Sequence, residues 1–406
     1  MNADAFFSTD YGTARDRFRA AVSRLGIPIE SHVIAAQGPH GESLSIDAAT
    51  LGPPQCRRAV ILSSGVHGVE GFFGSALQLA WLASLESAVA LPKDVKVVVV
   101  HALNPFGFAW LRRCNENNVD LNRSFLGDRA FIASPQYRES LEAYDRLSSV
   151  LNPACPPSSW EPYTLKAVWQ ILAAGRSARK RLPADQRPPL LAFNAIGRLG
   201  RAELQKTLLV GQYHRQKGLF YGGDGQEEST AWLEERLPVW VSGAELTLHL
   251  DFHTGLGQWA DGKLLIADRK TSPRAQWLAE QFGDELVEAA ESPVAYIPDG
   301  SIARYFRDHH GGGIYHCLTA EFGTYQGIRV LGALRAENQA HFHARPDSPA
   351  YQWAKRQVRE AFAPAATDWR KTVIAKALAV VARAIDVCRG TAPGPAANRV
   401  SSGSPW

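Results

Sequence analysis

The sequence of 406 residues lacks any long uninterrupted hydrophobic run. Its most apolar late stretch, residues 373–385, contains Lys376 and Arg383 and is too short to cross a bilayer. Residues 1–7 have neither the basic segment nor the long apolar segment of a signal peptide, so we expect none. We therefore expect no association with a membrane.

Cysteine is scarce as well. The five cysteines are odd in number, scattered and never spaced as paired metal ligands: Cys56, Cys114, Cys155, Cys317 and Cys388. We therefore expect neither a disulfide framework nor a cysteine zinc site. Isolated thiols of this kind fit a reduced compartment, so the expected localisation is cytoplasmic.

An excess of one charge is also missing. The 44 basic and 40 acidic side chains give a net charge of +4, and the basic residues form no dense stripe. Nucleic acid is therefore not an expected partner. Hydrophobic residues at 45% and charged residues at 21% are proportions typical of a soluble globular protein.

Two compact apolar runs, at residues 59–63 and 96–103, indicate strands that are buried on both faces. Residues 71–85 between them have helical hydrophobic spacing, which predicts a strand–helix–strand unit with parallel strands. A short amphipathic helix is expected at residues 16–25. Further strands are expected at residues 29–35, 43–46, 245–253, 263–267 and 314–321. The predicted fold class is α/β.

The chain is interpreted as one catalytic domain, residues 1–390, with helices over most of residues 326–385. Residues 131–238 contain helix-like pieces, proline-rich loops and no clear buried strand, so we interpret them as an insertion. Residues 218–223 inside it, with the sequence GLFYGG, are interpreted either as a structured loop that reaches the active site or as an aromatic packing turn. Residues 391–406, rich in Pro, Gly and Ser, are expected to be disordered.

Three potential metal ligands lie at the ends of predicted strands. His67 and Glu70 are three residues apart, directly after the strand at residues 59–63, so their side chains can converge on one ion. His253 ends the strand at residues 245–253, at the edge where open α/β sheets bind ligands. Each residue alone would more often be a packed core residue. Together they predict a catalytic zinc site with three protein ligands and one ion per chain.

A polar segment at residues 113–123, with the sequence RCNENNVDLNR, is expected to line the same site. A cation such as Arg113 can stabilise a developing oxyanion. The planar guanidinium of Arg123 suits bidentate recognition of a carboxylate. Glu321 follows a predicted strand and supplies a carboxylate that can take a proton from water. The alternative for the two arginines is simple surface solvation.

In combination these segments resemble the zinc carboxypeptidases of the M14 superfamily. The shared order is H-x-x-E, then R-x-N and V-D-x-N-R, then D-x-H, and finally a glutamate after a strand. The local sequences SGVHGVEGF, NPFGF, RRCNENNVDLNRSF and DFHTG resemble the DUF2817 branch more specifically, over about residues 62–325. The resemblance implies a zinc-carboxypeptidase-like fold with a central, mixed, mostly parallel sheet flanked by helices.

The resemblance also implies which residues form the metal site. His67, Glu70 and His253 correspond to the zinc ligands. Asp120 corresponds to the carboxylate that orients the first of these histidines. The implied cofactor is Zn²⁺.

The resemblance further implies which residues transfer the proton of the attacking water and which bind the substrate. Glu321 corresponds to the general base that takes a proton from the attacking water and later protonates the leaving amine. Arg113 corresponds to the arginine that polarises the scissile carbonyl. Asn122 and Arg123 correspond to the pair that grips the free carboxylate of the substrate.

Two features depart from the family pattern. The gap from Glu70 to His253 is longer than in the well-known carboxypeptidases, so we expect the insertion to reshape the substrate pocket. The mobile tyrosine of the family, a substrate-binding residue, corresponds best to Tyr296, which precedes the sequence GSI at residues 300–302. Tyr305 is the rival, and either tyrosine could instead be a packed aromatic.

The predicted function is zinc-dependent hydrolysis of an amide bond next to a free carboxylate, with a peptide substrate as in a metallocarboxypeptidase. The alternative is an N-acyl amino acid deacylase, because aspartoacylase and succinylglutamate desuccinylase resemble the sequence DLNRSF at residues 120–125 equally well. A catalytically silent scaffold is a remote third interpretation. A serine hydrolase is disfavoured because G-x-S-x-G is absent; the sequence HGGG at residues 310–313 is interpreted as a turn.

Overall fold

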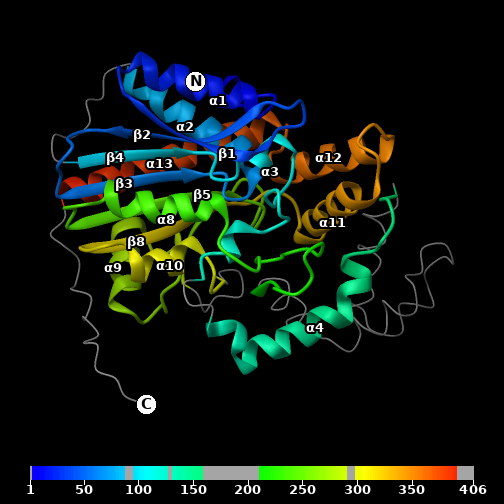
Figure 1. The fold of residues 1–406 in the computed structure, drawn as a ribbon. Helices are drawn as coiled ribbons and strands as arrows, with labels where there is room; N and C mark the ends of the chain where they lie inside the picture. Colours follow the sequence, from blue (N-terminus) through cyan, green and yellow to red (C-terminus); the bar gives the residue numbers. More distant parts are fainter. Residues whose placement is uncertain (1, 87–94, 127–129, 159–209, 290–297, 391–406) are drawn as a thin grey trace.

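The structure is a computed structural model that describes residues 2–86, 95–126, 130–158, 210–289 and 298–390 (Figure 1). Three parts of the sequence-based prediction lie outside these residues: residues 159–209 of the expected insertion, Tyr296, and the expected tail at residues 391–406. The division into one domain with an insertion therefore stays a prediction.

An eight-stranded sheet forms the centre of the molecule, in the order β1-β2-β4-β3-β5-β8-β6-β7. The strands are β1 (Ile29–Gln37), β2 (Ser43–Leu51), β3 (Arg58–Ser64), β4 (Val95–His101), β5 (Leu246–Thr254), β6 (Gly262–Ile266), β7 (Val287–Ala289) and β8 (Ile314–Phe322). The central strands β4, β3, β5 and β8 run parallel, whereas β2 and β6 pair antiparallel with them from either side. The predicted mixed, mostly parallel sheet is confirmed.

Helices cover both faces of this sheet (Figure 1). One face packs against α1 (Tyr11–Arg24), α2 (Gly71–Glu86), α9 (Pro273–Phe282) and α13 (Thr367–Gly390). The other face packs against α8 (Glu228–Trp240) and α10 (Ile302–His309). Four helices gather at one end of the sheet: α3 (Pro105–Ala109), α4 (Pro135–Leu151), α11 (Gly327–His343) and α12 (Pro349–Phe362). Short 3-10 turns are η1 (Ala3–Phe6), η2 (Gly68–Glu70), η3 (Leu121–Arg123) and η4 (Ala130–Ala133).

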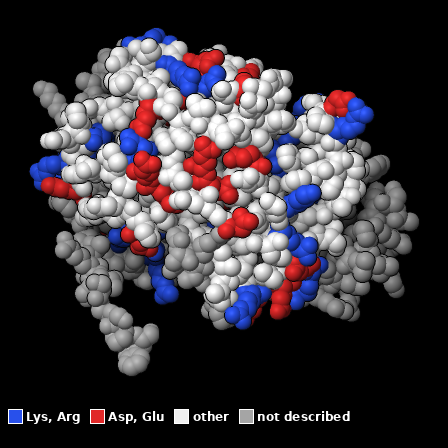
Figure 2. Space-filling model, viewed as in Figure 1, with Lys and Arg blue, Asp and Glu red and all other residues white. Residues whose placement is uncertain are grey.

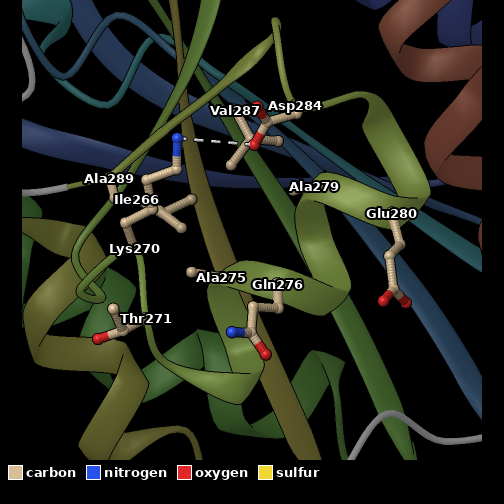
Figure 3. A pocket seen from close by; sticks show the side chains of 10 residues that line it. All are labelled: Ile266, Lys270, Thr271, Ala275, Gln276, Ala279, Glu280, Asp284, Val287 and Ala289. Atoms are coloured by element: carbon tan, nitrogen blue, oxygen red, sulfur yellow. Dashed lines mark ion pairs between the residues drawn. The ribbon is translucent and has the colours of Figure 1, made fainter.

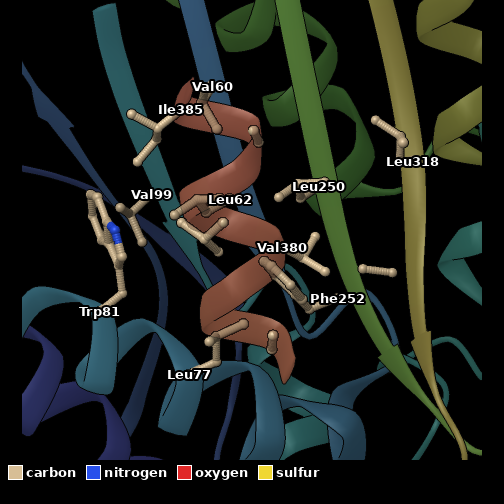
Figure 4. Close-up of a cluster of buried hydrophobic side chains, with 14 of the residues drawn as sticks. Val60, Leu62, Leu77, Trp81, Val99, Leu250, Phe252, Leu318, Val380 and Ile385 are labelled. Atoms are coloured by element: carbon tan, nitrogen blue, oxygen red, sulfur yellow. The ribbon is translucent and has the colours of Figure 1, made fainter. Parts of the chain in front are cut away.

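The alternation of side chains along the central strands separates two hydrophobic cores. Val60 and Leu62 of β3 face the cluster formed with α2 and α13, where Figure 4 also shows Trp81 and Val380. Ile61, between them in sequence, faces the cluster on the side of α8 and α10. Full burial of one such aliphatic side chain contributes about 1.5–3 kcal/mol, so these two layers hold the strand ends in fixed positions.

Two elements differ in length from the prediction for local reasons. Helix α1 begins earlier, at Tyr11, because Oδ1 of Asp10 accepts a hydrogen bond from the backbone amide of Thr13 at 2.7 Å and caps the helix. Strand β4 ends at His101, earlier than predicted, because Ala102 adopts a φ of 63° and turns the chain.

None of the helices in the described part of the chain is long and apolar enough to cross a membrane. The five cysteines are free thiols. On the face shown in Figure 2, side chains of both charges are interspersed, and acidic ones gather near its centre. An ion pair of Glu30 with Arg236 and a contact of 3.1 Å between Nε2 of His32 and Oε1 of Glu228 tie β1 to α8.

Candidate active site

Three buried side chains converge at the C-terminal ends of β3 and β5. Nδ1 of His67 lies 2.9 Å from Oε1 of Glu70, and Nδ1 of His253 lies 3.1 Å from Oε2 of Glu70. The two Nδ1 atoms are 3.2 Å apart. Donor atoms about 2.0–2.1 Å from a tetrahedral zinc lie about 3.3 Å from one another, so these distances match one face of such a site. His67, Glu70 and His253, called the metal-ligand group below, can therefore hold a metal ion.

A carboxylate holds each histidine from behind. Nε2 of His67 lies 3.0 Å from Oδ1 of Asp120, and Nε2 of His253 lies 2.7 Å from Oδ2 of Asp251. Because a carboxylate accepts hydrogen bonds, each Nε2 carries a proton, and each Nδ1 faces the other two side chains of the group. Carboxylate–histidine pairs of this kind are typical of metal-binding histidines.

The turn after β3 packs against the segment that carries Arg113. Gly68 has no room for a side chain, since a Cβ there would lie 2.1 Å from the carbonyl carbon of Gly107. The backbone amides of Gly68 and Val69 donate to the carbonyls of Arg113 and Arg112 at 3.1 and 2.8 Å. The same backbone contacts therefore position the ligand turn and the arginine relative to each other.

Glu321 lies near the end of β8, directly opposite His253 in the parallel ladder with β5. Its Oε1 accepts a hydrogen bond from the backbone amide of Leu256 at 2.8 Å. Burial, followed by the negative charge of Glu70, raises the pKa of Glu321 to about 7. A carboxyl group with a pKa near neutrality can both take up and release a proton, which suits acid–base chemistry.

Asp120 joins Arg113 and Arg123 in one buried ionic cluster. Its Oδ2 accepts from Nε of Arg113 at 2.9 Å and from Nη1 of Arg123. Nη1 of Arg113 also lies 3.2 Å from Oε1 of Glu70, so this cation touches the metal-ligand group. Burial opposes the charged form of Arg113, but Asp120 and Glu70 outweigh it and raise its pKa. For Arg123 burial prevails and lowers the pKa.

The predicted loop at residues 218–223 reaches this cluster. The ring of Phe220 covers both guanidinium groups, with its centroid 5.0 Å from Cζ of Arg123 and 6.0 Å from Cζ of Arg113. The backbone amide of Asp120 donates to the carbonyl of Tyr221 at 2.7 Å. A segment nearly a hundred residues away in sequence therefore forms one wall of the site.

The asparagines at residues 115–118 hold this loop in place. The side-chain amides of Asn115 and Asn117 donate to Oε2 of Glu227 at 2.7 and 2.8 Å. The amide of Asn118 donates to the carbonyl of Gly218 at 3.1 Å. These amides thus bind residues 218 and 227, whereas Arg113 and Asp120 of the same segment contact the metal-ligand group.

Asn122 contacts the first turn of α10, and Tyr305 belongs to that helix, where its ring packs against Phe125 and Phe306. Oδ1 of Asn122 accepts from the backbone amide of Ile302, in the first turn of α10, at 3.1 Å. Burial, then Glu234, raises the pKa of Tyr305 to about 12, in keeping with a packed aromatic side chain. Its rival Tyr296 lies outside the described residues.

The predicted roles did not include Asp251 or Phe220. Asp251 precedes His253 by two residues on β5, so the alternation of a strand already places both on one face, and this signal was available in the sequence. Phe220 carries no comparable signal, because its contact with Arg123 depends on how the chain returns from the expected insertion.

The glycine run at residues 310–313 forms a turn before β8. Gly311, Gly312 and Gly313 all have positive φ, between 72° and 139°. A Cβ on Gly313 would lie 2.3 Å from the carbonyl oxygen of Ala244. These glycines therefore meet a backbone requirement, as the sequence interpretation expected.

A separate hollow of about 610 Å³ lies between β6, β7 and α9 (Figure 3). Its lining includes apolar residues such as Ile266 and Ala275, and Lys270 and Asp284 form an ion pair of 3.9 Å beside it. None of the metal-ligand residues lines this hollow, so it is distinct from the candidate active site.

Three solved structures are similar to this chain to different degrees. Thrombin-activatable fibrinolysis inhibitor is similar over 94% of this chain and 75% of its own, with 11% identity and a TM-score of 0.51. Carboxypeptidase A from Helicoverpa armigera is 11% identical over 88% of this chain and 74% of its own, with a TM-score of 0.43. Succinylglutamate desuccinylase from Chromobacterium violaceum is 15% identical over 86% and 74%, with a TM-score of 0.36. A search of curated proteins finds no match.

The first of these similarities supports the predicted zinc-carboxypeptidase-like fold, and identities this low concern the fold alone. A family described as "Protein of unknown function (DUF2817)" has a sequence model that matches residues 7–376, most of the chain. The motif resemblance had indicated the same family. The chain therefore belongs to the DUF2817 family.

Proposed function

We propose that this protein is a zinc-dependent hydrolase that cleaves an amide bond next to a free carboxylate, as a carboxypeptidase-type metallopeptidase. One observation carries the proposal: two imidazole nitrogens and a carboxylate converge within 2.9–3.2 Å of one another. Glu321 stands opposite one of these ligands in the sheet, and Arg113 touches another. This is the donor set of a catalytic zinc together with a base and a cation.

The residues divide the reaction between them. Zinc held by the three ligands supplies a Lewis acid for water and for the amide carbonyl. Glu321 takes a proton as the water oxygen attacks the carbonyl carbon, and returns it to the nitrogen as the carbon–nitrogen bond breaks. Arg113 stabilises the negative charge that develops on the carbonyl oxygen.

Arg123, with Asn122, binds the carboxylate of the substrate in this proposal. Its side chain is only slightly exposed, beneath Phe220. A Cβ on Gly211 would lie 2.4 Å from Cδ of Arg123. The backbone at Gly211 therefore approaches this arginine as closely as glycine allows. A small substrate requires less open surface here than a peptide does. This observation favours the second candidate, an N-acyl amino acid deacylase of the aspartoacylase or succinylglutamate desuccinylase type.

Metal analysis tests the site itself. Protein purified gently and supplied with zinc is expected to hold about one zinc ion per chain. Absence of bound zinc in that measurement would refute the proposal. A double substitution, His67→Ala with His253→Ala, is the control and is expected to retain none.

A substrate screen then separates the candidates. Short peptides and N-acyl amino acids are incubated with the zinc-loaded protein, and the products are identified by mass. Released C-terminal residues identify a carboxypeptidase, and released acyl acids identify a deacylase. Zinc binding without turnover of either class would favour the silent scaffold.

We also propose a reduced cytoplasm as the compartment. The free state of all five cysteines supports it. Burial raises the pKa of Cys114, next to Arg113 in sequence, to about 12, so this thiol stays protonated at neutral pH. Such a thiol is a poor nucleophile and a poor ligand.

A further inference from the structure

A chain of buried hydrogen bonds leads away from the metal-ligand group. Oδ1 of Asp251, the oxygen not used by His253, lies 2.6 Å from Oγ of Ser63. Oγ of Ser63 also lies 2.6 Å from Nε2 of His249. Nδ1 of His249 in turn lies 2.6 Å from the hydroxyl of Tyr315. All of these side chains are buried, with at most 2% exposure.

Three adjacent strands supply the members of this chain. His249, Asp251 and His253 alternate along β5 and share one face of the sheet. Ser63 of β3 is the direct cross-strand partner of Asp251, and Tyr315 comes from β8. This series of hydrogen bonds is therefore held by three central strands of the sheet, and no loop residue contributes to it.

The number of protons on each side chain determines which group donates in each of these three hydrogen bonds. A carboxylate only accepts, so Ser63 gives its one hydroxyl proton to Asp251 and must accept from Nε2–H of His249. A neutral imidazole has a single N–H, so Nδ1 of His249 accepts from the hydroxyl of Tyr315. Burial lowers the pKa of His249 to about 4, and the ring is neutral at physiological pH.

We propose that Ser63, His249 and Tyr315 are positioning residues for the metal ligand His253. In this series of hydrogen bonds Ser63 donates to Oδ1 of Asp251. The carboxylate is thereby held in the orientation in which its Oδ2 accepts from Nε2 of His253. Nε2 of His253 then keeps its proton, and Nδ1 would be the atom that binds zinc. The inference rests on the proposed zinc site and adds residues that do not touch the ion or the substrate.

The two ligand histidines are supported in different ways. The spare oxygen of Asp120, behind His67, accepts from two arginines. The spare oxygen of Asp251 accepts from a neutral hydroxyl. Two cations withdraw charge from Asp120, whereas the neutral chain leaves Asp251 its full negative charge. A carboxylate that keeps its charge makes its histidine a stronger donor to a metal.

Zinc affinity, measured by chelator competition, tests the inference. Ser63→Ala removes the donor to Asp251, and we expect zinc to dissociate about tenfold more readily, at the low end of the effects seen for carboxylates behind ligands. His249→Leu is expected to weaken zinc binding to the same extent as Ser63→Ala. His249→Gln retains one donor and one acceptor and is expected to bind zinc within about threefold of the wild type.

Ser75→Ala is the matched control. Oγ of Ser75 also lies 3.0 Å from a buried histidine, His101, but this pair has no contact with the metal-ligand group. Ser63→Ala loses two buried hydrogen bonds and Ser75→Ala loses one, so a purely structural role predicts a lower melting temperature for both variants and a zinc affinity equal to that of the wild type. We expect the visible absorption of the cobalt-substituted protein to change for Ser63→Ala and to stay unchanged for Ser75→Ala.

Two results would contradict the inference. Equal zinc affinity of wild type, Ser63→Ala and Ser75→Ala would overturn it while leaving the proposed zinc hydrolase intact. Failure of the wild type itself to bind zinc would overturn both. If His249→Leu does not fold, Ser63→Ala and His249→Gln still decide the question, because the first removes a single hydroxyl group and the second keeps a donor and an acceptor at this position.

Discussion

Asp120 holds His67 through a hydrogen bond of 3.0 Å between Oδ1 and Nε2. The other oxygen of the same carboxylate holds Arg113 and Arg123. One completely buried side chain therefore fixes a proposed metal ligand and two cations at the same time. Any change to Asp120 is expected to affect metal binding and the positions of the charges together.

Substitution of Asp120 by Asn is the first prediction. The neutral amide leaves two buried cations without a counter-charge, so the free energy of unfolding should fall by about 3–5 kcal/mol. Zinc affinity should fall about 10–100-fold because His67 loses its carboxylate partner. Asp47→Asn is the control, since Asp47 is equally buried and pairs with Arg19 at 2.8 Å. That variant should lose stability in urea but keep its zinc affinity; equal affinities for both variants would contradict the role of Asp120.

Substitution of Glu321 by Gln is the second prediction. The amide cannot take a proton from water, so hydrolysis should fall by at least about 10²–10⁴-fold, the contribution of general acid–base catalysis. Zinc content should stay the same, since Glu321 is not one of the three ligands. Glu245→Gln, an exposed change directly before β5, should retain both activity and zinc. Retained turnover in Glu321→Gln would remove it from the role of the base.

The third prediction concerns Phe220. Its ring covers Arg123, and cation–π contacts contribute about 0.5–2 kcal/mol, so Phe220→Leu should raise KM about 2–30-fold with a smaller effect on kcat. Phe220→Tyr keeps the aromatic face and is the matched control. Steady-state kinetics on the best substrate measure the difference. Identical KM values for the leucine and tyrosine variants would show that the ring does not support substrate binding.

The fourth prediction concerns the pH dependence of stability. Burial is the main cause that lowers the pKa of His101 to about 4 in the folded protein, against 6.5 for an ordinary histidine. Between these values the unfolded chain binds a proton that the folded protein excludes, so stability falls as pH falls from 6.5 to 4. At pH 5 the loss from this residue is about 2 kcal/mol relative to pH 7.5. His101→Gln, compared with the wild type in urea at both pH values, should show a smaller loss; an unchanged difference would exclude the effect.

The central strands and the ligand positions could be predicted from local sequence. Uninterrupted apolar runs reveal β3 and β4, because a strand buried on both faces needs apolar side chains on both. His67, Glu70 and His253 follow, since they stand directly at the ends of such strands. Strand β7 could not be predicted in this way. Its three residues are only partly buried and carry no recognisable pattern.

The supports of the site were harder to predict. The chain from Asp251 to Tyr315 joins three strands, and its order depends on the register of β3, β5 and β8, which no single segment specifies. Asn115 and Asn118 are polar residues of the segment that carries Arg113 and Asp120, and only the folded structure shows that they bind Glu227 and Gly218. Residues that carry the chemistry are marked by type and spacing, whereas their supports are defined by tertiary contacts.

The backbone hydrogen bond between Asp120 and Tyr221 has a consequence for how this family can diversify. It joins the two ends of the long segment between residues 120 and 221. We expect that changes of length between Arg123 and Phe220 would leave the proposed metal ligands in place, because this hydrogen bond lies next to them. Such an arrangement would let substrate range change separately from bond cleavage.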